Sequence, residues 1–238
     1  MDASQQKILE AAERCIPFYT EQLNQRRRML NETVVGKQML LKLNPNSDVT
    51  DLEEAEKQLH FNSLLNIALI ELLVIMKHLM LSTNEWEKAY FLKHSYMIVH
   101  ETIGRCDRYN RELNKFKNQY PELKPLYEKV SADLKLFKKT YDYPSAFSAV
   151  RNAIVAHIDP DIGVYYDAVA ALDGDKVLAI INSFSSILMD FLQFSVQIAA
   201  LETKRMDDQG INIDQQIEDL KAKIDQLFAN AAKGILPK

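Results

Sequence analysis

Helix-breaking residues are scarce in this chain, which has only six glycines and seven prolines among 238 residues. In the segments between them, apolar residues mostly recur at spacings of three and four, the periodicity of one side of an α-helix. An apolar side of a helix has to pack against neighbouring helices. The sequence therefore predicts an all-α fold, an up-and-down bundle of about six to eight helices.

The expected helices follow one another with short breaks. Thr50 and Asn84 each lie three residues before a glutamate, which is the spacing of a capping box at the start of a helix. Residues 159–175 contain two glycines and several aspartates, so we expect a loop or a short hairpin there. The expected helices cover about 4–30 with a kink or restart at Pro17, 34–43, 50–81, 85–118, 125–141, 145–158, 177–205 and a last helix after a polar break at 207–210.

No shift in composition demands a second large domain. We expect residues 1–205 to form one helical bundle and residues 206–238 to form a C-terminal helix. Apolar residues in this helix alternate at spacings of four and three, which is the pattern of a narrow seam. The seam needs a partner surface, either the chain's own bundle or a second copy in a dimer. It consists of Ile213, Ile217, Leu220, Ile224 and Leu227.

Two long apolar stretches, residues 64–81 and 177–201, raise the question of a membrane span. Glu71 interrupts the first and Asp190 the second, and a carboxylate at the bilayer centre costs about 2.5–3.5 kcal/mol. We therefore expect both to be central helices of a soluble bundle, with no membrane partner. The start of the chain lacks the pattern of a secretory signal and only two cysteines are present, so a cytoplasmic location is expected.

Several common catalytic patterns are missing from the sequence. It contains no glycine-rich phosphate loop followed by lysine, no dinucleotide fingerprint and no serine between glycines. Two cysteines are too few for a cysteine-based zinc site, and no histidine lies three residues after a glutamate, as a di-iron bundle requires. We expect neither a metal nor a cofactor, and we assign Glu71 and Asp190 a structural role.

Residues 150–160, Val-Arg-Asn-Ala-Ile-Val-Ala-His-Ile-Asp-Pro, place an arginine, an amide and a histidine just before a helix stop. The planar fork of Arg151 suits phosphate, and His157 exchanges protons near neutral pH. Helices also often end in a cation, because their last carbonyls carry partial negative charge, so a capping role stays open. On a continuous helix the two residues lie about 240° apart in rotation. Two copies facing each other across a two-fold axis could bring them together.

Positive charge is concentrated before this segment, although the formal net charge of the chain is −4. Ten basic residues stand against five acidic ones between positions 105 and 139. Arg105, Arg108, Arg111 and Lys115 are weak candidates for substrate binding, because they could guide a polyanion toward the neighbouring motif. A solvated helix surface explains the same charges, and both interpretations stay open.

An all-helical chain in which a histidine follows an arginine and a polar residue by four to six positions resembles the HEPN superfamily of prokaryotic defence and toxin proteins. Residues 151–159, Arg-Asn-Ala-Ile-Val-Ala-His-Ile-Asp, look especially like HEPN-type proteins found near abortive-infection systems. The resemblance implies a HEPN-like bundle that acts as a metal-independent endoribonuclease in a defence or toxin–antitoxin setting. Its active site would be completed in a homodimer.

The resemblance also implies roles for individual residues. Arg151 would hold the scissile phosphate, His157 would act as general acid or base, and Asn152 would orient the phosphate or the histidine. Asp159 and Asp161 are weaker candidates for supporting residues. The expected partners are RNA, a second copy of the chain, and an antitoxin or another protein. Some HEPN-like proteins are non-catalytic, so a helical interaction or regulatory module is the alternative.

Overall fold

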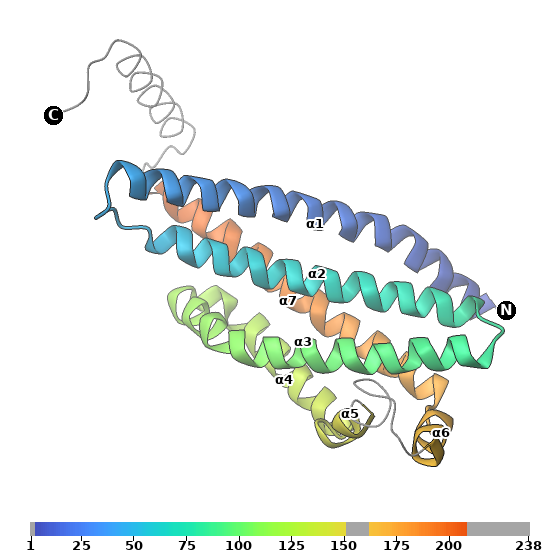
Figure 1. The fold of residues 1–238 in the computed structure, drawn as a ribbon. Helices are drawn as coiled ribbons and strands as arrows, with labels where there is room; N and C mark the ends of the chain where they lie inside the picture. Colours follow the sequence, from blue (N-terminus) through green and yellow to red (C-terminus); the bar gives the residue numbers. More distant parts are fainter. Residues whose placement is uncertain (1–2, 151–161, 209–238) are drawn as a thin grey trace, which may run out of the picture. The chain divides into compact units, whose positions relative to one another are not determined.

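The computed structural model describes residues 3–150 and 162–208, and in these ranges all regular elements are helices (Figure 1). The prediction of an all-α bundle is confirmed. The elements are α1 (Ala3–Leu43), α2 (Thr50–Leu81), α3 (Glu85–Gln119), the 3-10 turn η1 (Pro121–Leu123), α4 (Lys124–Thr140), α5 (Ser145–Val150), α6 (Ile162–Ala170) and α7 (Gly174–Asp208).

The chain divides within α7 into two compact units, Met1–Ser195 and Val196–Lys238, and the packing described below is that of the first unit. The predicted boundary at residue 205 stays a prediction. The predicted C-terminal seam from Ile213 to Leu227 lies outside the described residues.

Helix α2 is the centre of the first unit. It lies between α1 and α3, which run along it on two sides (Figure 1). Leu65, Leu69 and Leu72 are almost completely buried along its length. The ring of Phe61 lies edge-on to Phe191 of α7, with 6.0 Å between the ring centroids. The nearly continuous apolar composition of α2 is therefore explained by neighbours on several sides.

Helix α4 packs against α7 in the first unit. The rings of Phe137 and Phe184 lie 5.2 Å apart, and Lys129 forms an ion pair with Asp190. The side chain of Asp190 is 16% exposed, so its pairing with Lys129 accounts for a carboxylate in the middle of an apolar helix. The structural role that we expected for Asp190 agrees with this contact.

Helix α1 differs from the prediction because it continues unbroken through Pro17 and through residues 31–33. Proline inside a helix removes one backbone hydrogen bond and costs about 3 kcal/mol. Packing against α2 along most of its length offsets this cost, and Lys37 of α1 also pairs with Glu56 of α2. The predicted break before residue 34 was therefore wrong, and so was a restart of the helix at Pro17; the kink there stays a prediction.

The two predicted capping boxes had different outcomes. At α3, Oδ1 of Asn84 accepts hydrogen bonds from the backbone N–H groups of Trp86 and Glu87, at 2.8 and 3.3 Å. At α2 the N-cap residue is Val49, which has no side-chain cap, so the box predicted at Thr50 was wrong. Asp48 accepts from the N–H of Thr50 at 3.0 Å instead.

The loop or hairpin predicted for residues 159–175 was also wrong in its described part, which contains α6 and the start of α7. Helix α6 forms although its first turn contains a glycine, because most of its other residues are apolar or tyrosine and can pack as one side of a helix. Helix α7 begins earlier than expected because Oδ1 of Asp173 accepts from the N–H groups of Asp175 and Lys176, at 2.9 and 3.2 Å.

Two described helices are long and apolar enough to cross a membrane, by length and composition: α2 and residues 174–205 of α7. In their most apolar windows, 44% and 50% of the residues are buried inside the protein. A core helix of a soluble protein meets the same criterion, so this is weak evidence for a span. Asn66 in the middle of α2 is fully buried, and its Nδ2 donates to the carbonyl of Tyr19 in α1 at 3.4 Å.

The capping contacts lead to a stability prediction. Replacing Asn84 with alanine removes the acceptor for two N–H groups, so we expect the free energy of unfolding to fall by about 1 kcal/mol. Glu53→Ala is the matched control, since the box that would have used this glutamate does not form. Urea denaturation of both variants measures the difference. An equal loss for both would contradict the assigned caps.

Candidate functional site

The residues that the sequence marks as catalytic, Arg151, Asn152 and His157, lie outside the described residues, as do the weaker candidates Asp159 and Asp161. The structure describes the two helices on either side of them. Helix α5 ends at Val150, immediately before the motif, and α6 begins at Ile162, immediately after it. The placement of these helices decides which part of the bundle the motif is attached to.

Helix α5 is anchored by Phe147, whose side chain is completely buried. Its ring lies 4.9 Å from Tyr96 of α3, 6.3 Å from Phe137 of α4 and 5.5 Å from Tyr143, measured between ring centroids. A buried aromatic side chain of this size stabilises the fold by about 1.5–3 kcal/mol relative to exposure. The residue before the motif is therefore attached to α3 and α4 by a well-packed contact.

Helix α6 meets the beginning of α3. The rings of Tyr166 and Trp86 lie 5.7 Å apart in an edge-to-face arrangement, with both side chains about half exposed. Figure 1 shows α5 and α6 at the same end of the first unit, beside the first half of α3. Both ends of segment 151–161 are thus attached to one stretch of one helix.

His100 is a polar residue of α3 close to this attachment. It lies one turn after Tyr96, and its ring centroid is 5.5 Å from that of Tyr143. Its Nδ1 atom is buried and has no hydrogen-bond partner within the described part of the chain. His100 was not predicted to be part of the site. Its spacing of four residues from Tyr96 nevertheless indicates that the two side chains lie on the same side of the helix.

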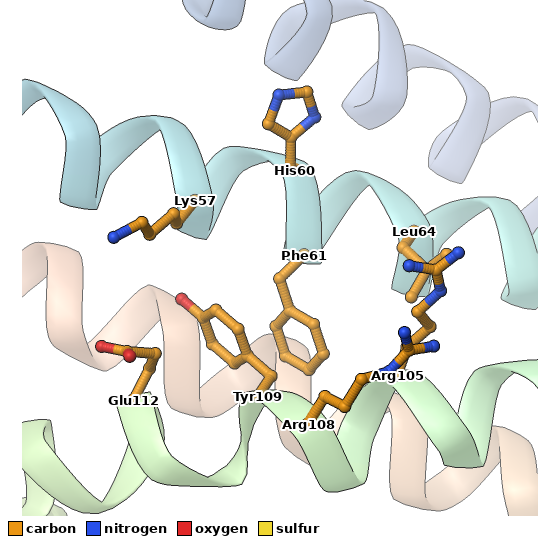
Figure 2. A pocket seen from close by; sticks show the side chains of 8 residues that line it. All are labelled: Lys57, His60, Phe61, Leu64, Arg105, Arg108, Tyr109 and Glu112. Carbon is orange, nitrogen blue, oxygen red and sulfur yellow. The ribbon is translucent and has the colours of Figure 1, made fainter.

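A second feature is a cleft of about 350 Å³ between α2 and α3. It arises where a stripe of α2 residues faces a stripe of α3 residues, each at helical spacings of three and four. Figure 2 shows the eight residues that line it. They are Lys57, His60, Phe61 and Leu64 of α2 and Arg105, Arg108, Tyr109 and Glu112 of α3.

The floor of the cleft is aromatic and apolar. Phe61 and Tyr109 are stacked, with 3.9 Å between their ring centroids and 14° between their planes. Burial raises the pKa of the Tyr109 phenol well above its ordinary value, and the carboxylates of Glu112 and Glu54 raise it further. The phenol therefore stays neutral and serves as part of the wall.

The rim of the cleft carries unpaired cations. Nε of Arg108 donates to the carbonyl of Gly104 at 3.0 Å, which holds this side chain against its own helix. Among the described residues, no carboxylate forms an ion pair with Arg105, Arg108 or Lys57. Figure 2 shows both guanidinium groups beside Leu64, toward the end of the cleft opposite Lys57.

The remaining polar groups of the cleft contribute less. Glu112 is engaged by Lys115, with 2.7 Å between carboxylate and ammonium. The ring of His60 points away from the space between α2 and α3, and its Nε2 lies 3.9 Å from Glu56 (Figure 2). Among the described residues, the cleft therefore has three cations without an ion-pair partner and one carboxylate that is already paired.

Of the four basic residues proposed for substrate binding, only Arg105 and Arg108 share the cleft. Lys115 does not line the cleft, although it pairs with Glu112, which does. Arg111 is exposed and lies about 240° around the helix from Arg105. Tyr96, which contacts α5, lies about 180° from Arg105, so the cleft and the attachment of the motif occupy opposite sides of α3.

A smaller groove of about 250 Å³ lies between α2 and the first half of α3, lined by Glu71, His94 and apolar residues. Nδ1 of His94 is 3.0 Å from the carbonyl of Tyr90. The apolar surroundings raise the pKa of Glu71, and His94 lowers it by a smaller amount. Glu71 lies in this groove, whereas Asp190 of α7 pairs with Lys129 of α4, so the two carboxylates do not form a pair.

We next consider groups of the described residues that could bind a metal ion or react as a thiol. Within residues 3–150 and 162–208, no three histidine, cysteine, aspartate or glutamate side chains are grouped to hold a metal ion. Cys106 is buried, and burial raises the pKa of its thiol to about 12. Such a thiol stays protonated at neutral pH and is unreactive.

Comparison with known proteins gives no further assignment. No protein-family model, no curated protein and no solved structure matches this chain.

The raised pKa of Glu71 gives a pH-dependent prediction. Because the folded protein favours the neutral carboxyl, stability is lost as the pH rises from the unfolded-state value of about 4.3 through the raised pKa. Glu71→Gln stays neutral, so we expect it to increase the free energy of unfolding at pH 7 and to have little effect at pH 4. Urea denaturation at the two pH values measures this.

The exposed Glu101→Gln serves as the control for this comparison. A gain for Glu71→Gln that is the same at pH 4 and pH 7, or a loss at pH 7, would contradict the assigned environment of Glu71.

Proposed function

We propose that this protein is a metal-independent endoribonuclease of the HEPN type, acting in a defence or toxin–antitoxin setting. The proposed catalytic residues are Arg151, Asn152 and His157. The observation that carries the proposal is the attachment of both ends of the motif segment, through α5 and α6, to the first half of α3 in an all-helical bundle.

This attachment supports a site rather than a simple helix end. A cation that only caps a helix needs no fixed position beyond its own last turn. Here the residue before Arg151 follows a buried anchor, Phe147, and the chain is held again at Tyr166 shortly after His157. In general, holding both ends of a chain segment lowers the entropic cost of positioning side chains between them.

The proposed reaction is an internal transfer at phosphorus. The ribose 2′-hydroxyl attacks the neighbouring phosphorus, the bond to the 5′ oxygen breaks, and the products are a 2′,3′-cyclic phosphate and a 5′-hydroxyl. One proton leaves the 2′-hydroxyl and one is delivered to the departing oxygen. Arg151 stabilises the charge that develops on the phosphate oxygens.

A second copy of the chain completes this scheme. The motif supplies one histidine per chain, whereas the reaction needs both a base and an acid. In an isologous dimer, His157 from one chain accepts the proton and His157 of the other donates one. Arg151 of both chains can then contact the same phosphate, even if Arg151 and His157 of one copy were separated as they would be on a continuous helix.

The proposal predicts RNA cleavage by the purified protein in the presence of a chelator. His157→Ala should lower the rate by about 10²–10⁴-fold through loss of proton transfer. Arg151→Ala should lower it by about 10²–10³-fold through loss of charge stabilisation. Gel analysis of a labelled RNA, with end-group analysis for the cyclic phosphate, measures both rates and products.

Matched controls are His78→Gln and Arg14→Ala, which alter exposed residues of the same types far along the sequence from the motif. Cleavage by all four variants at the wild-type rate would identify a contaminating nuclease and refute the proposal. Activity per chain should also rise with protein concentration through the dimer dissociation midpoint. Constant activity per chain across that range would refute the shared site.

A helical interaction or regulatory module is the second candidate, and exposed apolar residues on α1 favour it. Phe18, Met29, Met39 and Leu43 are each about half exposed. Their helical positions fall within an arc of about 80°. Apolar side chains gathered on one side of an exposed helix are typical of a protein-binding surface. Under this candidate the protein binds a partner, and the motif variants leave that binding unchanged.

A further inference from the structure

We infer that the cleft between α2 and α3 is a binding site for a small phosphomonoester with an aromatic or apolar body. Arg105 and Arg108 would hold the phosphate, and Leu64 and Tyr109 would contact the body. This site is distinct from the proposed nuclease motif, because it lies on the opposite side of α3 from α5.

The charges at the rim point to an anion. Arg105 and Arg108 lie three residues apart on α3 and both line the cleft, no described carboxylate forms an ion pair with either, and like charges at this helical spacing repel each other (Figure 2). A bound phosphate would relieve this repulsion and accept paired hydrogen bonds from each planar fork. The contact between Arg108 and the carbonyl of Gly104 uses only Nε, so the terminal nitrogens remain free to bind.

The floor of the cleft points to an apolar body on the same ligand. Leu64, together with Tyr109, which is stacked on the buried Phe61, offers apolar surface next to the cations (Figure 2). A free phosphate ion would leave this surface in contact with water, whereas an attached ring would cover it. Burial of apolar surface contributes about 25 cal/mol per Å².

The dimensions fit a small molecule. Arg105 and Glu112 are seven residues apart on α3, and so are Lys57 and Leu64 on α2, so each wall is about 10 Å long. The volume of about 350 Å³ is at the lower end of ligand pockets in general. Phe61 is only 6% exposed and already stacked, so it cannot act as a platform for successive bases of a single-stranded nucleic acid.

Phenyl phosphate is the direct probe of this site, measured by isothermal titration calorimetry on the full chain. Inorganic phosphate tests the charged part of the ligand and benzyl alcohol tests the body. We expect phenyl phosphate to bind at least about tenfold more tightly than either, because it uses both parts of the cleft. Added salt should weaken it.

Substitutions separate the two contributions. Arg105→Gln and Arg108→Gln should each weaken phenyl phosphate about tenfold or more, whereas Arg111→Gln, on the same helix but outside the cleft, should leave the affinity unchanged. Leu64→Ser should weaken phenyl phosphate but not inorganic phosphate. Circular dichroism and thermal unfolding establish that each variant is folded, which is expected for the exposed arginines.

Several outcomes would overturn the inference. These are absence of phenyl phosphate binding at millimolar concentration, equal weakening by Arg111→Gln, and equal affinity for phenyl phosphate and inorganic phosphate. Arginine-dependent binding of an RNA oligonucleotide without binding of phenyl phosphate would make the cleft part of a polynucleotide surface instead. None of these results depends on RNA cleavage, so failure of this inference and failure of the proposed nuclease are distinguishable.

Discussion

The burial of α2 between α1 and α3 is the interaction on which the rest of the first unit depends. A single helix of this composition would be unstable in water, because it is apolar on nearly all sides. Its neighbours remove that surface from water, and each fully buried leucine contributes about 1.5–3 kcal/mol. Leu65, Leu69 and Leu72 supply this burial at successive turns. The same contacts keep α1 continuous at Pro17, where local propensity favours a break.

Helix α3, which packs against α2, has two sides with different neighbours. One side carries Tyr96 and receives α5, so it holds the chain next to the proposed catalytic motif. The opposite side carries Arg105 and faces α2, where the cleft forms. Because each residue rotates by about 100° around the helix axis, Tyr96 and Arg105 lie about 180° apart and belong to opposite sides of α3. A basic segment that looks uniform in the sequence thus supplies different surfaces of the protein.

Much of the fold could be predicted from the sequence because helical periodicity is a local property of the chain. The helix start at Asn84 was correctly identified, since a capping side chain acts on N–H groups two and three residues away. The continuity of α1 at Pro17 was missed because it depends on packing against α2, which no local pattern encodes. Helix α6 was not predicted because glycine and aspartate favour loops in sequence-based prediction, and its apolar residues were given less importance than these two residue types.

The candidate sites, like the fold, could be predicted from the sequence only where local patterns determine them. The motif was recognised from spacing alone, and its residues lie outside the described ranges, so its roles remain proposals. Arg105 and Arg108 were selected only for their charge. Their shared cleft depends on Leu64 and Phe61, which are more than forty residues away in the sequence and come close only through helix packing. His100 was not selected for the site, because its importance depends on Tyr143 and the position of α5.

Ion pairing explains why an acidic protein can still have a local anion site. With a net charge of −4, the chain as a whole repels polyanions, and a general attraction to RNA is not expected. Most of its paired lysines use neighbouring carboxylates, which cancels their charge locally. Arg105, Arg108 and Lys57 have no such partner among the described residues, so their charge remains available over short distances, within a Debye length of about 8 Å. The cancelled lysines include Lys37 with Glu56, Lys77 with Glu13, Lys88 with Glu85, Lys115 with Glu112, Lys129 with Asp190 and Lys138 with Asp107.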